Sequence, residues 1–302
     1  MEVRLSAISR IILACALFVG CGPSQRDRSS SSPHTESSAT AQSKPVAHLA
    51  DFKSGQKESK KDSRTTGEVA IAAASDLKFA LEELLADFQQ KNPGIHIKAT
   101  YGSSGNFFAQ LTNKAPFDLY LSADVDYPRK LIEAGRAIRE SEFTYATGHL
   151  VLWVPKDSEL KVEEKGIQTL FDASVKKISI ANPKHAPYGR AAVASLKSLA
   201  VYEQVEGRLV LAENIAQAAQ FIETGAADIG LISRSLAMAP TMGDKGRSWP
   251  IPETAHPPIV QSGVILNWVQ DREAAEKVRS YLISDDGMAI LKKYGFTEPP
   301  VN

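Results

Sequence analysis

Cysteine is scarce in this chain of 302 residues, and its two cysteines, Cys15 and Cys21, both lie near the start. The sequence after Cys21 therefore offers no thiol for a disulfide bond or for a thiolate zinc site. A protein without such links must be stabilised by its hydrophobic core, which a chain of this length is able to supply.

Net charge is lacking too, because 35 lysines and arginines balance 35 aspartates and glutamates. No stripe of basic and aromatic residues stands out, so the sequence predicts no nucleic-acid partner. With 43% hydrophobic residues the chain has enough apolar material for one or two cores, and its length favours roughly two domains.

Long apolar runs are missing, and the run within residues 1–24 is too short for a membrane-spanning helix. It follows Arg4 and Arg10 and ends in small residues at Cys21. A basic start followed by a short apolar stretch is typical of a secretory signal peptide, so we expect an exported protein.

The letters FVGC, which end at Cys21, resemble the lipobox of bacterial lipoproteins, whose cysteine receives lipid and becomes the mature N-terminus. Phe18 stands where that box prefers leucine, and ILAC at Cys15 matches less well because its apolar region after Arg10 is very short. We expect residues 1–21 to be a lipoprotein signal peptide, with lipid on Cys21 as the protein's only membrane anchor. An ordinary cleaved signal is the alternative.

Residues 22–66 are rich in Ser, Lys, Asp and Thr and contain almost no large apolar side chains. Such a segment buries too little surface to offset the entropy lost on ordering. We therefore expect a disordered tether between the signal and the rest of the chain.

From residue 67 onward, apolar runs of strand length alternate with helical patterns. The strand-like runs are EVAIAAAS, IHIKATY, DLYLSAD, HLVLWVP and KKISIANP, and the helical patterns include DLKFALEELLADFQQKNPG, DYPRKLIEAG, GRAAVASLKSLAVYEQV and ENIAQAAQFIETGAA. This alternation predicts an α/β fold with a mostly parallel sheet covered on both faces.

Three strand-to-helix junctions have chemistry that suits an anion. Ser75 follows the run AIAAA, Ser104 lies in YGSSG, and NPKHAPYGRAA leads through Tyr188 into another helix. Ligands of such sheets bind where helices begin, and a helix N-terminus offers free N–H groups to an anion. Helix capping explains each junction alone, but the three together favour an anion site built from neutral donors.

The order of the landmarks resembles the periplasmic molybdate-binding proteins of ABC importers over residues 68–297, in AAASDL, YGSSG, PFDLYLSAD, NPKHAPYG, ENIAQA, GAADIGLIS and LISDDGMAILKKYGF. The resemblance implies a two-lobed type II periplasmic binding protein fold, each lobe a mostly parallel sheet flanked by helices. Lobe 1 would hold about 67–147 and 251–302, and lobe 2 about 148–250.

The resemblance also implies that molybdate or tungstate binds between the lobes. The matching positions are Ser75 and Ser104, which would donate hydroxyl and amide hydrogens, and Tyr188 and Ile215, which would donate backbone N–H groups. The fifth position is a tyrosine hydroxyl in some members but Ser233 here, which is shorter by most of a ring. Whether Ser233 or the Tyr188 phenol makes the fifth contact stays open.

By the same resemblance, the partners are an ABC permease and its ATPase, and the protein is a monomer without catalytic activity. No cofactor and no free metal ion is implied, because molybdenum would be bound as the oxyanion. Molybdate carries two negative charges and no proton near neutral pH, so its site needs donors, and a carboxylate would repel it. We expect Asp76, in the first turn of a helix, to point away from the ligand.

Other functions are less favoured. Sulfate or another tetrahedral oxyanion is the nearest alternative to molybdate. A serine hydrolase is a distant one, because YGSSG is not the G-x-S-x-G elbow. A receptor for an organic ligand needs an apolar or aromatic pocket, whereas Trp153, Trp249 and Trp268 lie away from the junctions.

Overall fold

The computed structural model describes residues 67–300. The segments predicted to be a signal peptide, residues 1–21 with Cys21, and a tether, residues 22–66, lie outside the described residues. Within residues 67–300, no helix has the length and apolarity needed to cross a membrane.

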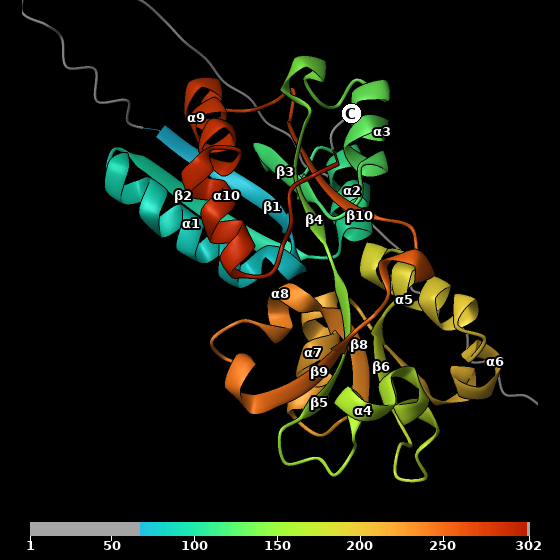
Figure 1. Ribbon diagram of the computed structural model, residues 1–302. Helices are drawn as coiled ribbons and strands as arrows, with labels where there is room; N and C mark the ends of the chain where they lie inside the picture. The colour runs from blue at the N-terminus through green and yellow to red at the C-terminus, as the bar shows by residue number, and fades with distance from the viewer. Residues whose placement is uncertain (1–66, 301–302) are drawn as a thin grey trace, which may run out of the picture. The chain divides into compact units, whose positions relative to one another are not determined.

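The first sheet has the strand order β2-β1-β3-β10-β4 (Figure 1). Its strands are β1 (Gly67–Ala74), β2 (Ile95–Gly102), β3 (Leu119–Ser122), β4 (Phe143–Gly148) and β10 (Ile259–Ile265). β1 pairs in parallel with β2 and β3, whereas β10 is antiparallel to both β3 and β4. The other four strands therefore share one direction, and we call the part built on this sheet lobe 1.

The second sheet has the order β7-β6-β8-β5-β9 and repeats this plan. Its strands are β5 (Leu150–Pro155), β6 (Ile178–Ala181), β7 (Leu209–Ala212), β8 (Ile229–Ser233) and β9 (Gly246–Pro250). Only β5 runs against its neighbours, β8 and β9. We call the part built on this sheet lobe 2. The predicted α/β fold is confirmed in both lobes, and each sheet is mixed, with four strands in one direction and one strand against them.

The chain passes between the sheets twice, as Figure 1 shows in green and in orange. β4 ends at Gly148 and β5 begins at Leu150, so only His149 separates strands of different sheets. The return runs from the end of β9 at Pro250 to the start of β10 at Ile259. Two connections of this kind allow a hinge motion between the lobes.

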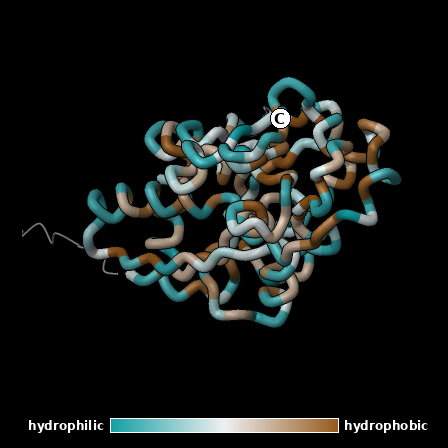
Figure 2. The backbone as a smooth tube through the Cα atoms, turned by 90° about the horizontal axis from the view of Figure 1, so that it is seen from below, coloured by the Kyte–Doolittle hydropathy of each residue, from teal (hydrophilic) through white to brown (hydrophobic). Residues whose placement is uncertain are grey.

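Helices flank both sheets because each helix has one apolar side that packs against a sheet. In lobe 1, Leu81, Leu84, Leu85 and Phe88 lie at helical spacing in α1 and are all buried. The helices of this lobe are α1 (Lys78–Lys91), α2 (Ser104–Thr112), α3 (Asp126–Glu133), α9 (Arg272–Leu282) and α10 (Asp285–Lys293). In Figure 2 many hydrophobic segments, in brown, lie toward the middle of the molecule, and many hydrophilic segments, in teal, lie along outer helices and turns.

Lobe 2 contains α4 (Val162–Lys165), α5 (Pro187–Ser198), α6 (Tyr202–Val205), α7 (Ile215–Glu223) and α8 (Arg234–Ala237). Its core includes Trp153, which is buried in β5. The single helical pattern predicted over residues 189–205 is wrong, because α5 and α6 are separate. Ala200 adopts a positive φ of 57° between them, the left-handed conformation in which helices commonly end.

Short 3₁₀ turns complete the structure: η1 (Ser75–Leu77), η2 (Arg139–Ser141), η3 (Gly166–Phe171), η4 (Glu206–Arg208), η5 (Gly243–Lys245) and η6 (Glu253–Ala255). η1 is the one that concerns the site, because it begins directly where β1 ends.

Candidate functional site

Ser75 begins η1 at the end of β1 and is buried. Its hydroxyl donates to Oδ1 of Asn214 at 3.2 Å and accepts the N–H of Ala216 at 3.3 Å. Asn214 is the N-cap of α7, and the same Oδ1 accepts the N–H of Gln217 at 3.0 Å. Ser75 of lobe 1 therefore contacts the N-terminus of a lobe 2 helix.

Ser104 is the first residue of α2, and its hydroxyl accepts the N–H of Ala123 at 3.0 Å. The Tyr120 hydroxyl donates to the Ser104 carbonyl at 2.7 Å and holds the backbone in place. Because the Ser104 oxygen is used as an acceptor, its own proton is available to a ligand.

Ser103 precedes α2, but its hydroxyl does not cap that helix. It donates instead to the His185 carbonyl of lobe 2 at 2.6 Å, and the Gly105 N–H reaches the same oxygen at 2.9 Å. A Cβ on Gly105 would come within 2.5 Å of that oxygen, so this approach of the lobes requires glycine. The two serines of YGSSG thus do different things.

Lobe 2 offers backbone N–H groups at the starts of α5 and α7. In α7, the N–H groups of Ala216, Gln217 and Ala218 bond to Ser75 or Asn214, which leaves that of Ile215 without a partner in the described part of the chain. In α5, Pro187 has no N–H, and that of Tyr188 is unpaired among residues 67–300. Unpaired N–H groups at a helix start attract anions.

These groups meet at one small cavity between the lobes. It is lined by Ala74, Ser75, Asp76, Gly102, Ser103, Ser104 and Ala123 from lobe 1 and by Ala186, Pro187, Tyr188 and Ile215 from lobe 2. Its volume is about 10 Å³, which is room for about one water molecule. The structure therefore brings four of the five predicted site residues together, in a closed arrangement of the lobes.

Ser233, the fifth predicted site residue, does not line this cavity. It is the N-cap of α8, where its hydroxyl accepts the Leu236 N–H at 3.3 Å and lies 3.0 Å from the Ser235 hydroxyl. The Tyr188 phenol is buried too, and its oxygen lies 3.5 Å from Nε2 of Gln261.

Asp76 corrects one expectation. We expected it to point away from the ligand, but Asp76 is 1% exposed and lines the cavity. Nε2 of Gln261 donates to its Oδ2 at 2.8 Å, while Oδ1 has no hydrogen-bond partner in the described residues. Burial raises the pKa of Asp76 from 3.8 to about 6, and hydrogen bonds from Tyr188 and Gln261 oppose that rise only in part.

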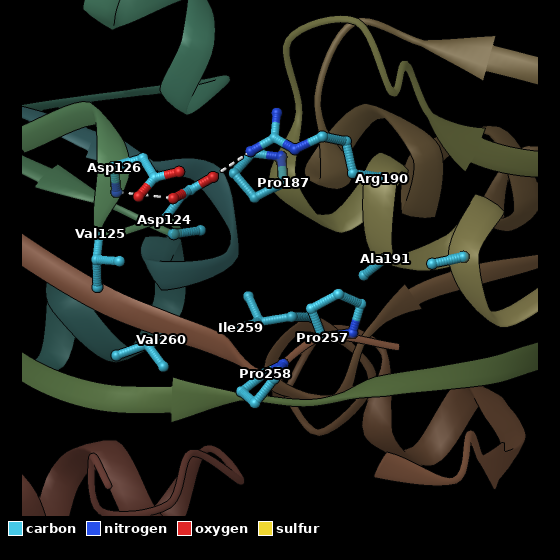
Figure 3. A pocket seen from close by; sticks show the side chains of 12 residues that line it. Asp124, Val125, Asp126, Pro187, Arg190, Ala191, Pro257, Pro258, Ile259 and Val260 are labelled. Atoms are coloured by element: carbon cyan, nitrogen blue, oxygen red, sulfur yellow. Dashed lines mark hydrogen bonds and ion pairs between the residues drawn. The ribbon is translucent and has the colours of Figure 1, made fainter. Parts of the chain in front are cut away.

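A larger cavity of about 410 Å³ adjoins the small one, because both are lined by Ala123 and Pro187. Figure 3 shows the guanidinium of Arg190, from α5, reaching the carboxyl of Asp124, which lies just before α3. This ion pair joins the lobes beside the site. Arg190 also donates to the Tyr127 hydroxyl at 3.1 Å.

Sequence reasoning missed the parts played by Asn214 and Asp76. Asn214 had a local signal, since an asparagine directly before an apolar helical pattern is a common N-cap.

Chemically, the cavity presents hydroxyl and amide hydrogens from neutral groups. The partners of the serine hydroxyls are amide, carbonyl and N–H groups, so their arrangement suits binding of an anion rather than activation of a nucleophile.

Comparison with known proteins agrees with this geometry. Residues 69–297 match the family described as bacterial extracellular solute-binding protein. The chain is 36% identical to the molybdate-binding protein ModA of Rhodobacter capsulatus over 230 residues, 76% of this chain and 88% of that protein. It is also 36% identical to ModA of Azotobacter vinelandii over 229 residues, 76% of this chain and 89% of that protein.

A solved structure of the Azotobacter vinelandii periplasmic molybdate-binding protein superimposes with a TM-score of 0.72 at 32% identity, covering 77% of this chain and 100% of the other. The two-lobed fold of periplasmic binding proteins, expected from the sequence, is thereby confirmed. The chain belongs to the bacterial extracellular solute-binding protein family.

Proposed function

We propose that this protein is the molybdate-binding component of an ABC importer, with tungstate as the other oxyanion of matching shape. The ligand binds in the small cavity between the lobes. Ser75 and Ser104 donate hydroxyl hydrogens from lobe 1, and Tyr188 and Ile215 donate backbone N–H groups from lobe 2. Ser233 takes no part in this proposal, since its hydroxyl caps α8.

The observation that carries the proposal is the meeting of these donors at one buried point between the lobes. The relatives named above support molybdate as the ligand. A tetrahedral oxyanion is larger than the present cavity, so the lobes move apart to admit it. The Ser75 proton, which Asn214 accepts in the closed structure, then turns to the ligand.

Calorimetric titration of the purified protein with molybdate, tungstate, sulfate and phosphate tests this function. We expect molybdate and tungstate to bind more tightly than sulfate by about a hundredfold or more. A smaller anion leaves about two donors unpaired, and each unpaired donor costs about 1–3 kcal/mol. Equal affinity for sulfate and molybdate contradicts the choice of ligand. Failure of all four anions contradicts the binding function itself.

We also propose that the protein is exported and anchored by lipid on Cys21, with residues 22–66 as a tether that leaves the lobes free to meet the permease and its ATPase. A flexible chain of this length spans about 35–40 Å on average. Mass spectrometry of the mature N-terminus tests the anchor: a lipid-modified Cys21 is expected, and an unmodified N-terminus beyond Cys21 excludes it.

A further inference from the structure

One charged side chain stands out in a cavity otherwise lined by neutral groups. Asp76 is 1% exposed, and its Oδ2 accepts a hydrogen bond from Gln261 at 2.8 Å. Its Oδ1 is buried and has no partner among residues 67–300. A buried carboxylate oxygen without a partner is unfavourable, so this atom needs either a proton or a ligand.

The neighbours of this carboxyl do not neutralise it. Gln261 in β10 and Tyr188 in α5 donate hydrogen bonds to it. Tyr145 in β4 lies near it, because burial, and after it the charge of Asp76, raises the pKa of Tyr145. None of these groups is a cation. Among residues 67–300, Asp76 is therefore offered hydrogen bonds but no positive charge, and burial favours its protonated form.

A doubly charged oxyanion in the same cavity would repel the ionised Asp76 carboxylate and so raise the cost of its buried charge. Protonation of Asp76 removes this repulsion, and the protonated carboxyl has an O–H that donates to an acceptor. Molybdate oxygens are acceptors only. Oδ1 is the oxygen for that proton, since Oδ2 already accepts from Gln261.

We propose that Asp76 is a ligand-binding residue that holds the oxyanion as the neutral acid, with one proton taken from solvent and held on Oδ1. This inference rests on the proposed function and deepens it. The balance is simple: ionised protein, dianion and one proton combine into a complex in which the Asp76 O–H donates to a ligand oxygen. The missing fifth donor, which neither Ser233 nor the engaged Tyr188 phenol provides, is then Asp76 itself.

Proton uptake makes binding depend on pH in a defined way. Molybdate does not titrate between pH 6 and 9, so any change there belongs to the protein. Above the range in which free Asp76 loses its proton, each pH unit should weaken molybdate binding by about tenfold. Sulfate, if it binds, should show the same slope because it is also a dianion throughout.

The experiment is calorimetric titration of the protein with molybdate at pH 8, in buffers with different heats of ionisation. The dependence of the measured heat on buffer gives the number of protons taken up. We expect about one proton per molybdate for the unmodified protein. For Asp76→Asn we expect none, with affinity nearly independent of pH, because the neutral amide donates from the same place.

Asp118→Asn is the matched control. Asp118 is also a buried carboxylate of lobe 1, but both of its oxygens accept N–H groups, from Ala70 at 2.8 Å and Gln270 at 2.9 Å, and it does not line the cavity. This variant should lower the melting temperature and keep the uptake of one proton. The proton uptake of the unmodified protein tests the inference even if neither variant folds.

Molybdate binding without proton uptake overturns the inference and leaves the proposed function standing. So does an Asp76→Asn protein that is folded but keeps the steep pH dependence. Tight binding of hydrogen phosphate in preference to molybdate, without uptake, overturns it as well, because the proton would then come with the ligand. If no oxyanion binds, the inference and the proposed function fail together.

Discussion

The two lobes approach the same cavity with different chemistry. Lobe 1 presents side chains, the hydroxyls of Ser75 and Ser104, whereas lobe 2 presents the backbone N–H groups of Tyr188 and Ile215. A side-chain donor is lost by substitution, but a backbone donor survives every substitution except proline. The comparison teaches that tolerance to mutation and contribution to binding need not coincide at this site.

The largest effect is expected when lobe 1 loses both hydroxyls. On the proposed binding mode, the double variant Ser75→Ala with Ser104→Ala removes two hydrogen bonds to a charged ligand, so it should weaken molybdate binding by about 3–6 kcal/mol. Calorimetry measures the affinity, and thermal melting without ligand should change much less.

Ser103→Ala is the matched control for this pair, because its hydroxyl donates to the His185 carbonyl and not to the ligand. It should weaken binding by about 0.5–1.5 kcal/mol, through a less stable closed form. If the control loses as much affinity as Ser104→Ala alone, the division of labour between these neighbouring serines is wrong.

The next effect concerns Asp76, the charged side chain that lobe 1 contributes to the lining of the small cavity, where the lining residues of lobe 2 are neutral. Burial raises the pKa of Asp76 from 3.8 to about 6, so the folded protein holds this proton more tightly than the unfolded chain. The stability that Asp76 contributes is therefore complete below about pH 4 and is lost as pH rises through about 6. The loss amounts to about 3 kcal/mol at about 1.4 kcal/mol per pKa unit.

Denaturant unfolding of the ligand-free protein and of Asp76→Asn from pH 4 to pH 8 measures this loss. The variant should become the more stable of the two as pH rises. Glu83 and Glu298, whose pKa values are lowered by their lysine partners, destabilise both proteins at low pH and cancel in the difference. A difference that does not change with pH would show that the Asp76 carboxyl is solvated.

Local patterns in the sequence were enough to predict strands β1, β2, β3, β5 and β6, helices α1, α2, α3 and α7, and the serines at the junctions. Strands β4, β7, β8, β9 and β10 were not predicted from these patterns. Periodicity places Ser75 and Ser104 at strand ends, and this depends only on neighbouring residues. The position of Asp76 depends instead on Gln261, which is 185 residues away, and that of Ser103 on His185, 82 residues away. A single sequence contains no local signal for such pairs.

The backbone donor of lobe 2 at Ile215 can be tested by substitution with proline, which removes the N–H. Ile215 is the first residue of α7, where proline fits a helix, and Asn214 before it is already extended at φ −146° and ψ 176°. Ile215→Pro should therefore keep α7 and weaken molybdate binding by about 1.5–3 kcal/mol, the value of one hydrogen bond to a charged group. Ile215→Ala, which keeps the N–H, separates this effect from lost packing.

Circular dichroism confirms that α7 survives, and calorimetry compares the two variants. Equal affinities for Ile215→Pro and Ile215→Ala would mean that this N–H does not face the ligand. The Tyr188 N–H at the start of α5 would then be the remaining donor that we propose for lobe 2.

The smallest effect is expected where the lobes touch outside the site. Arg190 of lobe 2 pairs with Asp124 of lobe 1, and their side chains are 39% and 22% exposed, so solvent screens the pair. Arg190→Gln should weaken molybdate binding by only about 0.5–1 kcal/mol, since the closed form loses one partly exposed ion pair. The loss should shrink at high salt, which calorimetry at two ionic strengths measures. An effect as large as that of Ser104→Ala, or one insensitive to salt, would place Arg190 at the ligand, and the site would then no longer consist of neutral donors alone.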